Sequence, residues 1–241
     1  MTRRSTQRSR PRGIHPHVDP EKLATLDRTL TGVFWLDIAT LHPHAARAKR
    51  FMDVSLALAA ITVLAPLLLL IALAVKLTSP GPAIFRQRRI GFRCNEFPMY
   101  KFRTMRAGAH LSEAELAQRE GKAFLKIESD PRITPLGRIL RRYSLDELPQ
   151  FFNVLEGTMS LVGPRPLLLT DLNRFPRRSQ MRRFSVKPGI TGLWQVSGRS
   201  SCTDEERMEL DRRYVNEWSL GLDVRILAKT VVVVFSGEDA Y

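Results

Sequence analysis

Residues 54–75 read VSLALAAITVLAPLLLLIALAV, and this stretch decides how the chain is built. Its 22 residues carry no charged side chain. A helix of that length measures about 33 Å, and the hydrocarbon core of a bilayer is about 30 Å thick. Because uncharged runs this long are rare in the cores of soluble proteins, the stretch predicts a helix that enters a membrane.

Two features of this run favour a hairpin over a straight span. Pro66, just past its middle, removes one helical hydrogen bond and costs roughly 3 kcal/mol in a helix interior. Lys and Arg beside membrane segments stay on the cytoplasmic side. Here they flank the run on both sides, as Arg47, Lys49, Arg50, Lys76, Arg86, Arg88, Arg89 and Arg93. We therefore expect a re-entrant hairpin that breaks at Pro66 and leaves both flanks on one face, with a kinked full span as the alternative.

The composition restricts the partners. The 241 residues carry a formal net charge of +14, and the isoelectric point is about 10.6. This balance fits either a nucleic-acid-binding protein or a protein on an anionic membrane surface. The uncharged run favours the membrane, so we expect anionic lipids as partners and no nucleic acid. Cys94 and Cys202 show neither a metal-binding spacing nor a disulfide framework.

Three regions follow from the order of these features. Residues 1–45 form a basic extension, rich in proline and polar residues, which we expect to be flexible. Residues 46–78 hold the membrane helix. Residues 79–241 carry the remaining motifs and form a domain outside the membrane.

Short patterned segments define the fold class of that domain. Strands are predicted at 83–87 and 97–103, joined by a tight turn into a β-hairpin. Thr134 followed by Pro135 is a helix start, and the helix beyond it mixes arginines with apolar residues, which suits a membrane surface. We therefore expect an α+β, mostly helical fold, in which a re-entrant helix hairpin and amphipathic interfacial helices surround a small domain with a short β-hairpin.

Residues 144–147, Ser-Leu-Asp-Glu, can be interpreted in two ways. In a capping box, Ser144 would cap a helix and Glu147 would reach back to it. In a catalytic pair, Asp146 would be a carboxylate nucleophile, since carboxylates form phosphoryl-enzyme intermediates, and Glu147 would bind Mg²⁺. The surrounding arginines favour the second interpretation because they could hold anionic phosphates; they are Arg132, Arg138, Arg141, Arg142 and Arg165.

Basic residues in rigid or extended segments are the candidates for phosphate binding. Arg165 lies between two prolines, and a fixed guanidinium can grip phosphate through two hydrogen bonds. Lys101 and Arg103 would share one face of a strand, where they could hold a diphosphate. For all three the alternative is a solvated side chain. Asp130, before Pro131, is either a second metal ligand or a turn residue.

Taken in order, the motifs resemble one family. They are KRxxD at 49–53, the apolar run with its proline, SPGP at 79–82, YKFRTM at 100–105, DPRIT at 130–134, DELPQ at 146–150, GPRP at 163–166 and KPGITG at 187–192. This order is similar to that of the bacterial sugar transferases, small monotopic phosphoglycosyl transferases that begin exopolysaccharide or glycan assembly. The resemblance covers about residues 46–241. One departure is Ala65, which stands where some members carry serine before the proline.

The resemblance implies a reaction and a place in the cell. A sugar-1-phosphate would pass from a UDP-sugar to polyprenyl phosphate, with release of UMP, through a covalent intermediate on Asp146. Glu147 would help to bind Mg²⁺, and the helix would break near Pro66. Phosphate and substrate binding is assigned to Lys101, Arg103, Arg132, Arg138 and Arg165. The expected location is the bacterial inner membrane, with the catalytic domain on its cytoplasmic face.

Two other classes of function explain less of the sequence. A nucleic-acid-binding protein accounts for the charge but not for the uncharged run. A single-pass membrane scaffold accounts for the run but not for the ordered acidic and arginine motifs. The sequence identifies neither the sugar nor the oligomeric state, so a homo-oligomer is left open.

Overall fold

The structure is a computed structural model that describes residues 43–106, 130, 132–168, 178–198 and 202–236. These residues all belong to one compact unit, Leu36–Tyr241. The predicted flexible extension, residues 1–45, lies outside the described residues except for 43–45, which begin the first described helix.

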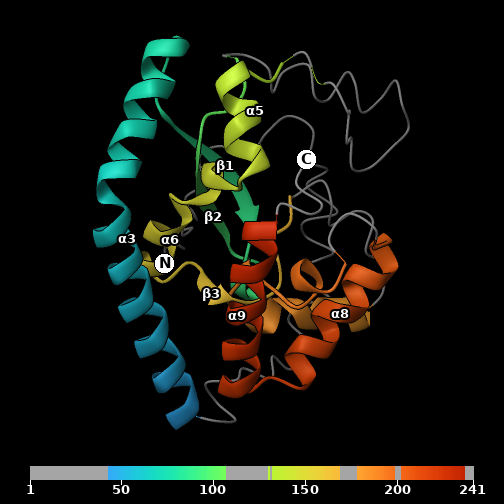
Figure 1. Ribbon diagram of the computed structural model, residues 1–241. Helices are drawn as coiled ribbons and strands as arrows, with labels where there is room; N and C mark the ends of the chain where they lie inside the picture. Colours follow the sequence, from blue (N-terminus) through green and yellow to red (C-terminus); the bar gives the residue numbers. More distant parts are fainter. Residues whose placement is uncertain (1–42, 107–129, 131, 169–177, 199–201, 237–241) are drawn as a thin grey trace, which may run out of the picture. The chain divides into compact units, whose positions relative to one another are not determined.

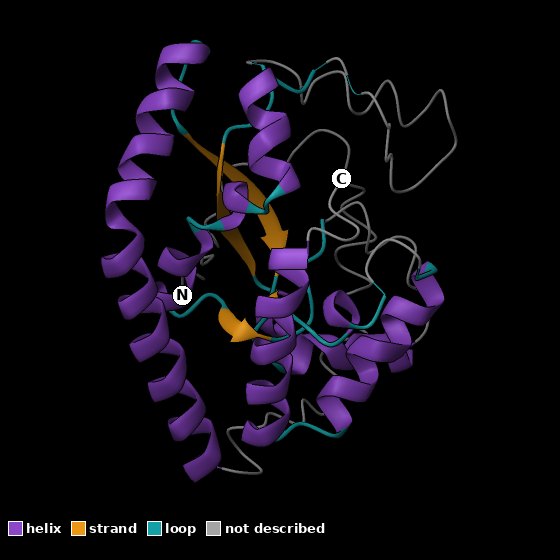
Figure 2. Ribbon diagram, in the orientation of Figure 1, coloured by secondary structure: helices purple, strands orange, loops and turns teal. Residues whose placement is uncertain are grey.

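Helices make up most of the described chain, and the strands are short (Figures 1 and 2). The α-helices are α3 (Pro43–Thr78), α5 (Pro135–Arg142), α6 (Gln150–Glu156), α8 (Asp204–Asn216) and α9 (Leu220–Ser236). Short 3₁₀ helices lie at Phe92–Cys94, Leu145–Glu147, Arg178–Ser185 and Trp194–Val196. The strands are β1 (Ile84–Ile90), β2 (Glu96–Phe102), β3 (Ser160–Val162) and β4 (Gly189–Thr191). The prediction of an α+β, mostly helical fold is confirmed.

Helix α3 does not show the predicted hairpin. Pro66 lies inside one continuous helix of 36 residues, so the structure does not show a chain that turns back there. The physical reason is packing on both sides of the proline: Ala57 is buried in one core cluster, and Ile71 and Val75 are buried in another. Burying an aliphatic side chain contributes about 1.5–3 kcal/mol, which offsets the cost of roughly 3 kcal/mol for an interior proline.

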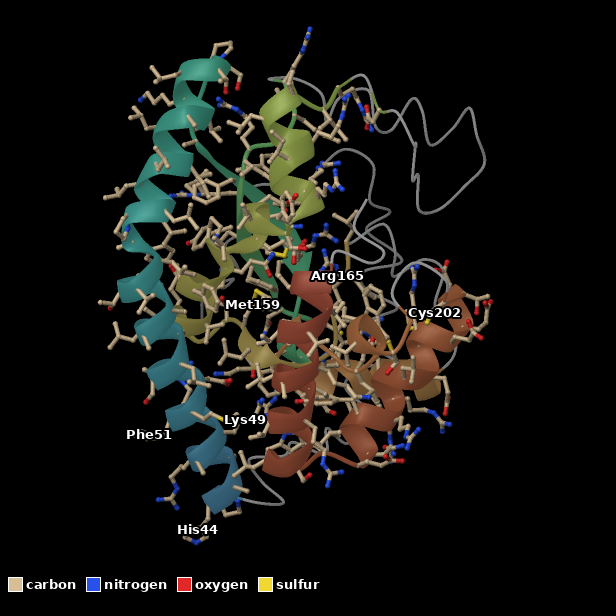
Figure 3. The ribbon with its side chains drawn as sticks, in the orientation of Figure 1. His44, Lys49, Phe51, Met159, Arg165 and Cys202 are labelled. Carbon is tan, nitrogen blue, oxygen red and sulfur yellow. The ribbon has the colours of Figure 1, made fainter. Side chains whose placement is uncertain are left out.

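The basic motif at the start of α3 fastens that end of the helix to the rest of the domain. Lys49 Nζ donates to Asp223 Oδ2 of α9 at 2.7 Å, and Figure 3 labels Lys49 near the lower end of α3. Arg50 donates to two backbone carbonyls at the end of α6, at 2.6 and 2.9 Å. Asp53 accepts a hydrogen bond from the backbone N–H of Leu161 at 3.1 Å. The KRxxD motif therefore ties α3 to α6, β3 and α9.

Arg103 fastens the other end of α3. Its guanidinium donates to the carbonyl oxygen of Ser79 at 2.7 Å, to Ser79 Oγ at 2.9 Å and to the carbonyl oxygen of Val75 at 3.3 Å. Gly81 has a φ of 113°, and a Cβ there would lie 2.6 Å from Nη1 of Arg103. Only glycine fits that turn. Both ends of α3 are thus held by the same domain.

Two pairs of strands position residues of the site. β1 and β2 pair antiparallel, with Arg86 opposite Tyr100, and the connection contains two residues with positive φ, Arg93 at 53° and Cys94 at 58°. The predicted β-hairpin is confirmed. β3 and β4 pair parallel. The first pair presents Lys101, near the end of β2, and the second leads directly into the GPRP motif at 163–166.

Helix α5 lies beside the C-terminal half of α3 (Figure 1). Thr134 caps it, accepting a hydrogen bond from the helix backbone at 2.9 Å, so the predicted helix start is confirmed. Leu136 and Leu140 pack in a core cluster with α3. Ile139 and Tyr143, by contrast, are 55% and 50% exposed. The apolar residues of α5 therefore form one stripe, of which Leu136 and Leu140 face the core and Ile139 and Tyr143 are exposed.

Candidate active site

The acidic pair, Asp146 and Glu147, lies in the connection between α5 and α6. Tyr143 ends α5, Ser144 adopts a left-handed φ of 54°, and a single 3₁₀ turn carries both acids. Ser144 makes no side-chain capping hydrogen bond, and the carboxylate of Glu147 is bound by basic side chains. The capping-box interpretation is therefore excluded, and the turn serves to present the two carboxylates.

Glu147 is held between two cations that come from different parts of the chain. Lys101 Nζ and Arg165 Nη2 each donate to Glu147 Oε1 at 2.7 Å, and Arg165 Nη1 lies 3.4 Å from Oε2. Figure 3 labels Arg165. Burial by itself raises the pKa of Glu147, but the charges and hydrogen bonds of Arg165 and Lys101 outweigh it, so the pKa lies well below its usual range. Glu147 is consequently ionised at neutral pH.

Asp146 has the opposite electrostatic balance. It is only 7% exposed, and burial is the largest effect on its pKa, which is raised above the ordinary value; the nearby charge of Lys101 acts against this, and the charge of Glu147 adds to it. Among the described residues, its carboxylate has no hydrogen-bonding partner. The surroundings therefore push the pKa values of the two acids apart, which is typical of carboxylates with different roles in one site.

Asp130 and Arg132 pair with each other. Arg132 Nη2 lies 2.6 Å from Asp130 Oδ2, and its Nε lies 2.8 Å from Oδ1. These hydrogen bonds hold the pKa of Asp130 below its ordinary value. Arg141, one of the arginines that the sequence places around the acidic pair, acts by its charge to lower the pKa of both Asp130 and Asp146, and it donates to Thr104 Oγ1 at 2.9 Å. Arg141 thus links the Asp130–Arg132 pair to the acidic pair.

The donor set fits Mg²⁺ only in part. Within the described part of the chain, no three His, Cys, Asp or Glu side chains are grouped to bind one ion. Mg²⁺ usually takes one or two protein carboxylates and completes its coordination with water and substrate phosphates, so the adjacent carboxylates of Asp146 and Glu147 suit it. Asp130 is engaged by Arg132, and the structure does not group it with that pair.

Two of the residues assigned to phosphate binding lie elsewhere. Arg103 is nine-tenths buried, and its hydrogen bonds go to the end of α3 and the turn that follows. Its contacts are those of a structural residue and not of a phosphate ligand. Arg138 is exposed on α5. The structure therefore brings Lys101, Glu147 and Arg165 together at Asp146, and it places Arg103 and Arg138 outside that cluster.

Comparison with known proteins supplies the family. The family model described as "Bacterial sugar transferase" matches residues 44–237, most of the chain. The chain belongs to the bacterial sugar transferase family. The resemblance inferred from the order of the motifs is confirmed, and the matched region includes α3, the acidic pair and the GPRP motif.

Members of the family from several bacteria are similar to this chain. The galactosyl transferase CpsE of Streptococcus agalactiae serotype III (strain NEM316) is 44% identical over 197 residues, which are 80% of this chain and 43% of that protein. The UDP-glucose:undecaprenyl-phosphate glucose-1-phosphate transferase of Xanthomonas campestris pv. campestris is 45% identical over 201 residues, 80% of this chain and 40% of that protein. The exopolysaccharide production protein ExoY of Sinorhizobium fredii (strain NBRC 101917 / NGR234) is 36% identical over 222 residues, 89% of this chain and 98% of that protein. The chain thus spans less than half of the first two proteins and nearly all of the third.

A buried ion pair that the sequence did not predict supports the GPRP motif of this bacterial sugar transferase. Arg183 Nη2 donates to the carbonyl oxygen of Arg165 at 2.7 Å and lies 2.8 Å from Asp211 Oδ2 on α8. Burial raises the pKa of Asp211 to about 6, although the charge of Arg183 acts to lower it. The pair fixes the main chain of the residue whose guanidinium holds Glu147. No spacing could have indicated it, because the three residues come from separate segments.

Proposed function

We propose that this protein transfers a sugar-1-phosphate from a UDP-sugar to polyprenyl phosphate and releases UMP. The observation that carries the proposal is the acidic pair: a buried Asp146 with a raised pKa beside a Glu147 that Lys101 and Arg165 keep ionised. The names of the relatives support it, because one acts on undecaprenyl phosphate and UDP-glucose. Membership of the family makes a phosphoglycosyl transferase the expected class of enzyme.

The reaction proceeds in two displacements at one phosphorus atom. A carboxylate oxygen of Asp146 attacks the phosphorus that bears the sugar, and the bond from that phosphorus to the UMP oxygen breaks, so UMP leaves with the electron pair. A phosphate oxygen of polyprenyl phosphate then attacks the same phosphorus. The bond to Asp146 breaks, which restores the carboxylate and yields polyprenyl-diphosphate-sugar. Two polyanionic substrates therefore never need to meet.

The basic residues stabilise the negative charge that develops on the phosphoryl oxygens during these steps. Lys101 and Arg165 lie on the carboxylate of Glu147, next to the position of the transferring phosphoryl group, where fixed positive charge stabilises its oxygens. Glu147, with the substrate phosphates, would hold Mg²⁺, which supplies further neutralisation of phosphate charge when bound. Asp146, with its raised pKa, is the more basic of the two carboxylates and the better nucleophile once ionised.

The test of this function is release of UMP. We expect purified protein, supplied with polyprenyl phosphate and Mg²⁺, to release UMP from one of a panel of UDP-sugars that includes UDP-glucose, UDP-galactose and their N-acetylated forms. A sugar-bearing lipid diphosphate should appear in equal amount. If no UDP-sugar in the panel yields UMP, the proposed donor class is wrong.

We further propose that α3 meets the membrane from one side, with the domain on the cytoplasmic face. Helix α3 is long and apolar enough to cross a membrane, and exposed apolar side chains run along it, among them Phe51 at 76%, Val63 at 77% and Leu77 at 76%. A contiguous exposed apolar surface of this kind indicates a membrane. Because both ends of α3 are held by the same domain, a straight span would carry part of that domain through the bilayer.

This arrangement predicts that both ends of α3 are accessible from the same side. Single cysteines at His44 and at Lys76, both exposed, would be introduced after Cys94 and Cys202 are changed to serine. We expect a membrane-impermeant maleimide to label neither cysteine in intact spheroplasts and both in inverted vesicles. Labelling of the two positions from opposite sides would show a full span.

A further inference from the structure

The outer face of α5 combines apolar and basic side chains in an unusual way. We define this face as Arg138, Ile139, Arg142 and the capping Tyr143. Spacings of three and four residues place them on one side of a helix. Ile139 and Tyr143 are 55% and 50% exposed, and the guanidinium of Arg142 lies 5.8 Å from the centre of the Tyr143 ring. Two exposed apolar groups thus lie beside two exposed cations.

The core does not require these apolar residues. Leu136 and Leu140, on the adjoining edge of the same apolar stripe of α5, already pack in one cluster with Ile71, Val75 and Phe102. Ile139 and Tyr143 lie outside that cluster. Their apolar surface is therefore available to a molecule that binds from outside, and the arginines beside them determine that this molecule carries negative charge.

The outer face of α5 leads to the acidic pair. Tyr143 is followed directly by Ser144 and the 3₁₀ turn that holds Asp146. Arg141, on the same helix, acts electrostatically on Asp146. Tyr143 and Ile139 are about 6 Å apart along the helix axis. A ligand with a phosphate at Asp146 and an apolar tail would therefore lie first over Tyr143 and then over Ile139.

We propose that the outer face of α5 binds the acceptor of the reaction, an isoprenoid phosphate, and directs its phosphate to Asp146. Ile139 and Tyr143 contact the first isoprene units, and Arg142, beside Tyr143, attracts the phosphate. This inference rests on the proposed function. A nucleotide sugar has no apolar tail to cover Ile139 and Tyr143, so the surface favours the acceptor over the donor.

The position of α5 explains how a lipid would reach this surface. The helix packs against the C-terminal half of α3 (Figure 1), where Leu69, Leu70, Leu73 and Leu77 are exposed. An isoprenoid chain that leaves the bilayer beside α3 therefore meets α5 before it meets the acidic pair. The acceptor and the water-soluble donor would then enter the site from different directions.

The test compares polar substitutions on α5 with a matched control on α9. Ile139→Ser and Tyr143→Ser would be assayed with farnesyl phosphate as the acceptor in detergent micelles, so that binding to a bilayer does not affect the measured KM. We expect the KM for farnesyl phosphate to rise roughly tenfold, because each variant loses apolar contact area with the chain. Ile139→Leu and Tyr143→Phe keep that area and should retain the KM of the unaltered protein. Val224→Ser is the control: Val224 is also 55% exposed and is followed by an arginine, and its substitution should leave the KM unchanged.

A second measurement separates acceptor binding from the first displacement. The single-turnover burst of UMP from the UDP-sugar alone should have the same amplitude in Ile139→Ser, in Tyr143→Ser and in the unaltered protein. An equal loss of burst and turnover, or an unchanged KM for farnesyl phosphate, overturns the acceptor assignment. Absence of the burst from the unaltered protein would instead contradict the proposed function. An effect confined to assays with anionic vesicles, and absent from micelles, would assign the face to bilayer lipids and also overturn the proposal.

Discussion

Asp146→Asn is expected to abolish turnover and, with it, the trapping of sugar phosphate on the protein. Asn has nearly the shape of Asp but no charge, and its amide oxygen cannot displace UMP. Loss of a covalent nucleophile lowers turnover by on the order of 10³-fold or more. The measurement is UMP release, together with acid quenching after mixing with a UDP-sugar labelled in the sugar. Label should stay with the unaltered protein and be absent from the variant.

The buried position of Asp146 makes this result easy to interpret. An amide in place of a buried carboxylate with a raised pKa removes a charge that the fold solvates poorly, so the variant should fold and give an unchanged circular dichroism spectrum. Asp204→Asn is the matched control, because Asp204 is only partly buried, at the start of α8. It should keep both turnover and trapping. Normal turnover by Asp146→Asn protein would end the assignment of Asp146 as nucleophile.

The membrane segment shows where local sequence reasoning reached its limit. The length and composition of residues 54–75 correctly predicted a long apolar helix. Whether the helix breaks at Pro66 could not be predicted from the run itself, because this depends on whether each half of the helix packs against the rest of the domain. Ala57 and Ile71 pack in two different clusters of the same domain, whose buried residues outside α3 lie 31 or more positions away in sequence.

In the site, too, the motifs predicted which residues come together, but not the contacts between segments that are distant in sequence. The motif order placed Lys101, Glu147 and Arg165 in one site, and the structure brings their charged atoms together. Alternation along a strand also put Arg103 with Lys101, but the guanidinium of Arg103 reaches the carbonyls at the end of α3. A helix end with unsatisfied carbonyls attracts a nearby cation. The sequence did not reveal that this helix end lies beside β2.

Arg183→Met is expected to cause the largest loss of stability among single substitutions near the site. Arg183 and Asp211 are paired at 2.8 Å, with side-chain exposures of 5% and 2%. Removing one partner leaves the other charge buried and uncompensated, which typically lowers the free energy of unfolding by about 3–5 kcal/mol. Methionine is unbranched and fills much of the same volume, so a cavity contributes little. Chemical denaturation measures the loss.

The pH dependence of this loss separates the ion pair from simple packing. Burial raises the pKa of Asp211 from an ordinary 3.8 to about 6, so between these values the folded protein binds a proton that the unfolded chain has released, and stability falls as pH rises. Without Arg183, nothing opposes the effect of burial, and the pKa of the folded state rises further. The destabilisation by Arg183→Met should therefore be larger at about pH 8 than at about pH 5.

The control for this prediction is an exposed ion pair on the same helix as Asp211. Arg212 pairs with Glu209 on the surface of α8, and Arg212→Met should leave the free energy of unfolding almost unchanged at both pH values, since exposed pairs are screened by solvent. Because Arg183 also holds the carbonyl oxygen of Arg165, the folded fraction of Arg183→Met protein should turn over more slowly with little change in the KM for the UDP-sugar. A loss of stability that is equal at both pH values would show that Asp211 does not carry the charge assigned to it.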